Sequence, residues 1–164
     1  MILTKKQLKR LHKYVMSLFS FKTEVTNVWF SIMQCMQRGG GDCDDYRNAM
    51  YEHLSLLGVP DSRIVFLDVL LQKGRFAGDQ HAILLIDEEY IMCNIYGVLL
   101  ARDYYRKTEH YIQLRYTMKD LDLGPVVHEL DHSANERDRY LRRRGQEVNG
   151  MATDEWRRVD SLIN

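Results

Sequence analysis

The apolar pattern of the chain changes its period near Pro60, and this change limits the folds open to it. Before Pro60, apolar side chains recur every three or four residues, as on one face of an α-helix. After Pro60, the chain holds runs of β-branched and aliphatic residues that short turns separate. Helices followed by consecutive strands are typical of an α+β domain with an antiparallel sheet.

The helical part has three predicted helices, each with a start or stop signal. They cover residues 5–18, 25–36 and 43–57. Thr4 with Gln7 is a capping-box signature for the first helix, and Asp42 is the expected N-cap of the third. Three consecutive glycines, residues 39–41, end the second helix and allow the backbone to turn and to approach other groups closely.

The part after Pro60 has four predicted strands, at residues 64–71, 80–86, 90–100 and 111–118. At 164 residues the chain is expected to form a single domain over residues 1–164. The charged segment 133–150 has few large apolar side chains, so it is expected to be exposed or flexible. A short closing helix is expected around Trp156.

The charge balance and the hydropathy exclude several classes of partner. The chain carries 23 Lys and Arg against 23 Asp and Glu, so no net positive charge favours nucleic acid or an acidic membrane. No apolar run reaches the roughly 18 residues of a membrane span, and the N-terminus does not resemble a signal peptide. Three cysteines cannot all pair within one chain. These features favour a cytoplasmic protein with free thiols.

Cys43 is the first candidate for chemistry, because it begins the third predicted helix. The N–H groups and dipole of a helix start lower a thiol pKa, and the Cys43 N–H is a potential oxyanion donor. The alternative is a buried structural cysteine. The neighbouring Asp42, Asp44 and Asp45 argue against an apolar setting. Since their charges raise the thiol pKa, catalysis needs an activating base or a bound cation.

His81 and Asn94 are the candidate partners of Cys43. His81 opens the second predicted strand, and Asn94 lies in the third, beyond a turn near Asp87. If these strands pair as antiparallel neighbours, Asn94 comes beside His81 and can orient the imidazole. The three residues then form a Cys–His–Asn arrangement, in which the histidine takes the thiol proton. For each residue alone, a purely structural role is the simpler interpretation.

These motifs together resemble the bacterial transglutaminase-like cysteine peptidases, in the papain/transglutaminase-like superfamily. Gly39-Gly-Gly-Asp-Cys-Asp-Asp-Tyr46 is similar to the family's nucleophile motif, and His81-Ala-Ile-Leu84 is similar to its histidine strand. Met92-Cys-Asn94 is similar to the L-D-N motif that carries its third residue, which is Asp in much of the family. The resemblance covers residues 29–96.

The resemblance implies a fold, a function and a site. The fold is papain/transglutaminase-like α+β, with N-terminal helices and the nucleophile helix packed on an antiparallel sheet. The function is that of a thiol peptidase acting on protein or peptide substrates through Cys43, His81 and Asn94, with no required cofactor. The place of Trp29 matches a family tryptophan, whose indole N–H is a candidate oxyanion donor. Asp42 and Asp44 match acidic residues that bind calcium in one branch, and Asp45 adds a third oxygen ligand.

Three alternatives stay open on the sequence. A transglutaminase or a glutamine deamidase would use the same three residues. A binding module could keep the fold without turnover. A zinc hydrolase could use His128-Glu129-x-x-His132, whose two histidines fall on one face of a helix. The basic run 137–144 is interpreted as a solvated helical face.

Overall fold

The computed structural model describes residues 2–23, 30, 32–123, 161 and 164. The first element is helix α1 (Lys5–Leu18), which begins at the predicted capping box of Thr4 and Gln7. The Gln7 N–H donates to the Thr4 hydroxyl at 3.3 Å, and the Thr4 N–H donates to the Gln7 side chain at 2.9 Å. Leu8, Leu11 and Val15 are the buried residues of this helix, as the helical period requires.

Two short strands and two helices connect α1 to the sheet. The elements are β1 (Ser20–Phe21), α2 (Ile32–Arg38), β2 (Gly40–Gly41) and α3 (Cys43–Leu56). β1 and β2 form a parallel pair, which the sequence analysis did not predict. Gly41 is required at its position, because an added Cβ would lie 2.8 Å from the Asp45 Cβ and 3.0 Å from the Cys35 sulfur.

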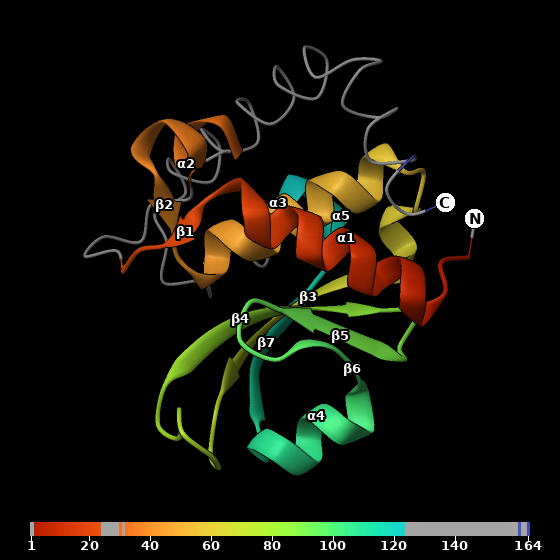
Figure 1. The fold of residues 1–164 in the computed structure, drawn as a ribbon. Coiled ribbons are helices and arrows are strands. Elements are labelled where there is room, and N and C mark those ends of the chain that lie inside the picture. Colours follow the sequence, from red (N-terminus) through yellow and green to blue (C-terminus); the bar gives the residue numbers. More distant parts are fainter. Residues whose placement is uncertain (1, 24–29, 31, 124–160, 162–163) are drawn as a thin grey trace.

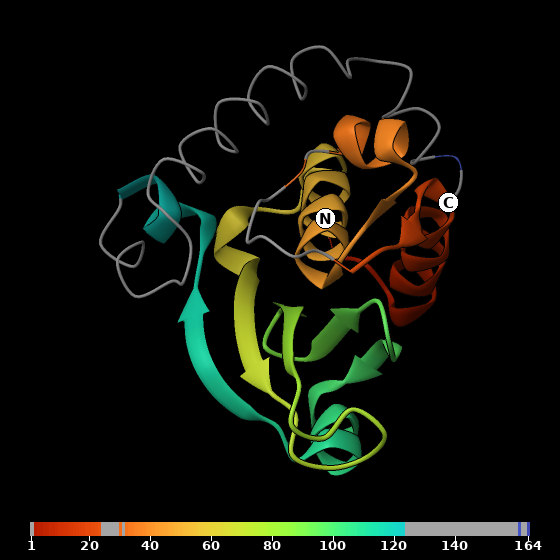
Figure 2. The same ribbon diagram turned by 90° about the vertical axis from the view of Figure 1, so that its left-hand side faces the viewer.

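The main sheet has five antiparallel strands in the order β6-β5-β4-β3-β7. The strands are β3 (Ile64–Leu70), β4 (Gln80–Ile86), β5 (Tyr90–Cys93), β6 (Gly97–Leu100) and β7 (Tyr111–Tyr116). The short helix η1 (Asp61–Arg63) leads into β3, α4 (Ala101–Thr108) connects β6 to β7, and α5 (Met118–Leu123) follows β7. Figure 2 shows β3 and β7 side by side as long curved strands.

The sheet carries a core on each face. The even-numbered residues of β3 and β4 pack with α1, α2 and α3, whereas the odd-numbered residues pack with Tyr104 of α4. Figure 1 shows α1 and α3 above the sheet and α4 below it. The nucleophile helix predicted from the sequence therefore packs on an antiparallel sheet, and the predicted α+β class is confirmed.

Two sequence-based expectations about this region were wrong. The predicted strand 90–100 is two strands, because the chain turns at residues 94–96 and Gly97 adopts a positive φ of 74°. Asn94 accordingly lies in the turn after β5 and not on a strand. Helix α4 was not predicted. The closing helix near Trp156 and the segment 133–150 lie outside the described residues.

Candidate active site

The start of α3 is built by a reciprocal capping box. The Asp42 carboxylate accepts the N–H groups of Asp44 at 3.1 Å and Asp45 at 3.4 Å, while the Asp45 carboxylate accepts the Asp42 N–H at 3.0 Å. Asp45 also accepts the Phe30 N–H at 2.8 Å. Cys43 is the first residue of the helix that this box stabilises. Local sequence therefore sets the place of the thiol.

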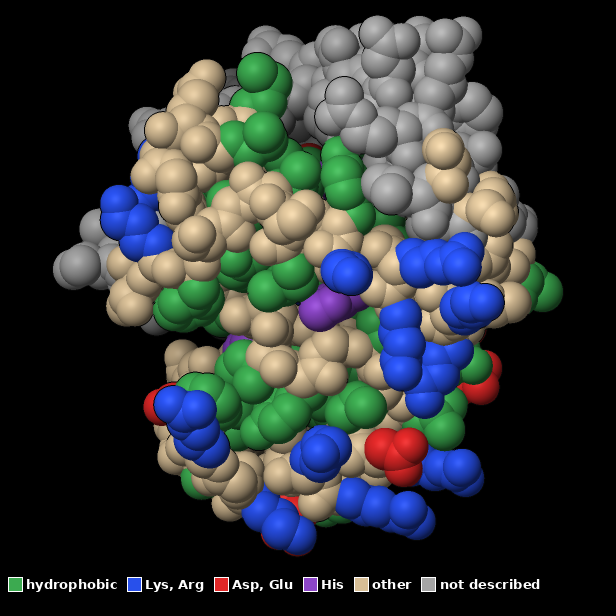
Figure 3. Space-filling view, in the orientation of Figure 1, with side chains coloured by type: hydrophobic (Ala, Val, Ile, Leu, Met, Phe, Trp, Pro, Cys, Tyr) green, Lys and Arg blue, Asp and Glu red, His purple; other side chains and the backbone are tan. Residues whose placement is uncertain are grey.

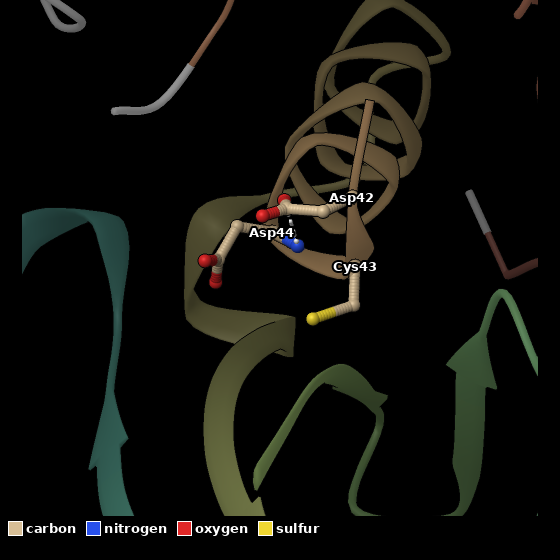
Figure 4. A group of neighbouring side chains, drawn as sticks. All are labelled: Asp42, Cys43 and Asp44. Carbon is tan, nitrogen blue, oxygen red and sulfur yellow. Dashed lines mark hydrogen bonds between the residues drawn. The ribbon is translucent and has the colours of Figure 1, made fainter. Parts of the chain in front are cut away.

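The Cys43 thiol lies where two strands of the sheet separate. Figure 4 shows its sulfur pointing from the first turn of α3 toward the strands. Within the described sheet, β5 pairs with β4 over Leu84–Ile86 and not over the first residues of β4. The Ala82 backbone forms a hydrogen bond to the sulfur. Cys43 is thus held beside the strand segment that contains His81.

The raised pKa of Cys43 favours the neutral thiol over the thiolate. Burial, which is the largest cause, and the charges of Asp44 and Asp42 together raise the pKa of Cys43 to about 12. The hydrogen bond from Ala82 and the charge of Arg47 oppose this rise in the pKa. The carboxylates act in the direction that the sequence analysis expected, but burial is the larger cause.

His81 is almost fully buried, with 6% of its surface exposed. Burial, which is the larger cause, and the positive charge of Arg47 together lower its pKa to about 4. The imidazole is therefore neutral at pH 7, which is the form a general base needs. Its Nε2 atom is buried and has no hydrogen-bond partner among the described residues. A buried polar atom of this kind is costly unless something binds it.

Asn94 follows β5 and lies in the same site. Its side-chain oxygen is buried and, within the described part of the chain, accepts no hydrogen bond. The preceding carbonyl, that of Cys93, accepts a hydrogen bond of 2.8 Å from the His12 ring in α1. Cys93 itself is buried, and its sulfur accepts the Tyr96 N–H at 3.2 Å. These bonds anchor the turn that carries Asn94.

One cavity of about 470 Å³ brings the three predicted residues together. Its wall includes Cys43, His81 and Asn94, and its other lining residues are Phe21, Leu71, Phe76, Asp79, Gln80 and Ile95. This volume lies in the range of typical ligand sites. The structure therefore places a thiol, an imidazole and a carboxamide on one cavity wall. Such a set can perform nucleophilic attack with proton transfer.

The acidic residues around Cys43 differ in what they can bind. Oxygen atoms of Asp42 and Asp44 lie with the Cys43 sulfur in a group whose atoms are all within 4.8 Å of one another. Asp44 also forms an ion pair of 3.3 Å with Arg47. Asp45 is outside this group, since its two oxygen atoms accept backbone N–H groups and its side chain is buried. Asp42 and Asp44 are thus the hard-cation candidates of this cluster.

Two further predicted sites lie outside the described residues. Trp29 is one of them, and the His128-Glu129-x-x-His132 motif is the other. Both remain predictions from the sequence. Among the described residues, no helix is long and apolar enough to cross a membrane.

The sequence analysis missed two residues that organise the site. His12 contacts the Cys93 carbonyl from α1, and its signal was a polar side chain between Leu8, Leu11 and Val15 on an apolar helix face. Arg47 lies one helical turn after Cys43 and is fully buried. Helix α3 is buried on nearly all sides. An arginine within such a helix is the sequence feature that could have indicated the role of Arg47.

Comparison with known proteins identifies the fold. No family model and no curated protein sequence matches the chain. Among solved structures, calcium-bound LapG of Legionella pneumophila matches with a TM-score of 0.57 and 20% identity, over 68% of this chain and 64% of that one. EGTA-treated LapG matches with a TM-score of 0.50 and 21% identity, over 60% of this chain and 57% of that one.

The chain thus spans less than two thirds of the length of the LapG structures that it matches. At this level of identity the likeness concerns the fold. LapG has a transglutaminase-like cysteine protease fold. The predicted architecture is therefore confirmed: the chain has a papain/transglutaminase-like α+β fold.

Proposed function

We propose that the protein is a thiol-dependent hydrolase of amide bonds, most simply a peptidase. The main support is one observation: Cys43 at the start of α3 lines one cavity with His81 and Asn94, and each of these two residues has a buried polar atom without a partner among the described residues. The likeness of the fold to LapG supports the same class of chemistry. The proposed substrate is a protein or peptide that enters this cavity.

The proposed reaction has two stages. His81 takes the proton of the Cys43 thiol, and the sulfur attacks the carbonyl carbon of an amide. The C–N bond then breaks, the amine leaves with the proton from His81, and a thioester to Cys43 remains. Water, deprotonated by His81, attacks the thioester and releases a carboxylic acid and the free thiol. In this proposal Asn94, whose side-chain oxygen has no hydrogen-bond partner among the described residues, would orient the imidazole, and the Cys43 N–H would stabilise the oxyanion.

The pKa values of the free protein also support a second candidate, a non-catalytic binding module. A Cys43 pKa of about 12 with a His81 pKa of about 4 corresponds to a neutral pair, without a resting thiolate. A catalytic site must then lower the Cys43 pKa when substrate or a cation binds. A transglutaminase or deamidase would share the first stage and differ in the substrate or the resolving nucleophile.

Calcium is the proposed cation. Asp42 and Asp44 would hold it, and LapG was solved in calcium-bound form. Two carboxylates supply a minority of the six to eight oxygen ligands that calcium prefers. A cation there would offset the two charges that raise the Cys43 pKa.

Alkylation of Cys43 by iodoacetamide tests the proposal. The rate is measured from pH 5 to 10 in wild type and in His81→Ala, with calcium or with a chelator, and labelling is assigned by peptide mapping. We expect fast labelling near neutral pH with calcium and at least a tenfold loss in His81→Ala. The buried Cys35 and Cys93 serve as internal controls. Slow labelling with an ordinary thiol profile in both proteins would favour the binding module.

A further inference from the structure

We infer that the cavity beside Cys43 is a side-chain subsite for a bulky apolar residue of the substrate. This inference rests on the proposed function, and it adds the chemical class that the site selects. The apolar walls come from Phe21, Leu71, Phe76 and Ile95. They belong to β1, the β3–β4 connection and the turn after β5, so segments distant in sequence form one surface.

Phe21 is the first apolar wall. Its ring is 58% exposed, although it lies beside the site. The strand that carries it is held firmly: β1 pairs with β2, and the Lys22 N–H donates to the Gly41 carbonyl at 2.8 Å. The Tyr46 hydroxyl of α3 donates to the Phe19 carbonyl at 2.7 Å. An aromatic side chain that is exposed beside Cys43, on a backbone held by these bonds, suits contact with an apolar ligand.

Phe76 forms the opposite wall. It is half-buried, whereas the other residues of the connection, 72–75 and 77–79, are exposed. The connection is pinned by hydrogen bonds from the Leu71 N–H to the Asp79 carbonyl at 2.9 Å and from the Gly78 N–H to the Leu71 carbonyl at 2.7 Å. Phe76 and Ile95 both pack on the lower core of the sheet. The wall is therefore preformed.

The charges at the cavity disfavour an acidic substrate side chain. Among its described lining residues, Asp79 and His81 are the ionisable groups besides the thiol, and none is Lys or Arg. Asp42 and Asp44 stand beside Cys43 as well. An acidic substrate side chain would meet carboxylates and apolar surface in the described lining, whereas the Arg75 guanidinium lies over the Phe76 ring, 5.4 Å from its centroid, and is not part of that lining. Figure 3 shows hydrophobic side chains bordering the hollow between the helical part and the lower part of the sheet.

Alkylating reagents of matched reactivity test this inference without any need for turnover. The reagents are N-phenethyl iodoacetamide, iodoacetamide, and iodoacetamides that carry a carboxyethyl or an aminoethyl group. Each rate at Cys43 is divided by the rate with free cysteine. We expect the phenethyl reagent to react at least tenfold faster than iodoacetamide, with saturation, and the carboxyethyl reagent to react slowest.

Phe76→Ala and Phe21→Ala should each reduce the phenethyl preference at least threefold, whereas Met33→Ala, which is similarly exposed but outside the cavity, should not. Equal corrected rates for all reagents, or a preference for the aminoethyl reagent, would overturn the subsite. Loss of His81 tests the proposed function separately, since it should slow every reagent and leave their ratios unchanged. If His81→Ala has no effect but the phenethyl preference persists, the subsite stands and the hydrolase proposal fails.

Discussion

At the scale of residues, the site contains two buried ionisable groups, Asp45 and His81. Their pKa values are shifted in opposite directions, so their contributions to the free energy of unfolding change oppositely with pH. Burial, with the charge of Asp42, raises the pKa of Asp45 to about 8, so its contribution to stability is lost as pH rises from about 4 to 8. Burial lowers the pKa of His81 to about 4, so its contribution is lost as pH falls from 6.5 to about 4. Between about pH 4 and 6.5, a fall in pH therefore increases the contribution of Asp45 to stability and decreases that of His81.

The contribution of His81 can be isolated by comparison with His81→Gln, which does not titrate. Between pH 7.5 and 4, wild type should lose more free energy of unfolding than the variant, by at most about 3 kcal/mol, because the folded pKa lies at about 4 and the ordinary value is 6.5. Urea unfolding at several pH values measures this difference. The half-buried His110 offers a control through His110→Gln, for which a smaller difference is expected. Parallel pH profiles of wild type and His81→Gln would contradict the assignment.

At the scale of elements, Arg47 joins helix α3, which begins at Cys43, to the sheet. Its guanidinium donates to the Asp68 carboxylate at 2.5 Å, to the Leu67 carbonyl at 3.0 Å and to the Tyr116 hydroxyl at 2.7 Å. These partners lie on β3 and β7, and Asp44 adds an ion pair within α3. One side chain therefore links α3 to two strands, and its charge acts on the pKa values of both Cys43 and His81.

Removal of this guanidinium should destabilise the protein strongly. We expect Arg47→Met to reduce the free energy of unfolding by about 3 kcal/mol, because the substitution leaves carboxylate, carbonyl and hydroxyl groups without their donor. Arg106→Met is the matched control, since Arg106 is 76% exposed and its ion pair with Asp103 spans 3.7 Å. That change should cost less than about 0.5 kcal/mol. Equal losses in urea denaturation would show that Arg47 does not join the elements as described.

At the scale of the whole molecule, strands β3 and β4 of the sheet are buried on both faces. The upper core contains α1, α2 and α3, and the lower core is closed by α4 through Tyr104. Tyr104 packs edge to face with Tyr96 and His110, with ring centroids at 5.8 and 5.1 Å. Because both cores share the same strands, we expect them to unfold together.

Tyr104→Ala should therefore reduce the stability of the whole molecule. The ring is fully buried, and its loss should cost about 3–5 kcal/mol in one cooperative transition that far-UV and near-UV circular dichroism report alike. Tyr105→Ala, next in sequence but 54% exposed, should cost far less. Two separate transitions in Tyr104→Ala would mean that the lower core unfolds independently.

The sequence by itself determined the features that depend on neighbouring residues. The capping box at Thr4, the N-cap at Asp42, the start of α3 at Cys43, and strand β4 follow from local hydrogen bonds and apolar period, and the structure has them where they were predicted. The turn at Asp87 and Glu88 also stands as predicted, with both residues at positive φ. The α+β class followed from the change of period at Pro60.

Only the tertiary structure decided what depends on distant segments. It divided the predicted strand 90–100 into β5 and β6, formed the β1–β2 pair, and bonded His12 to the Cys93 carbonyl. It also used the Asp45 carboxylate for the Phe30 and Asp42 N–H groups, and buried Cys43 and His81 enough to shift both pKa values. Burial is a sum over contacts between segments far apart in the chain, so no local pattern encodes it.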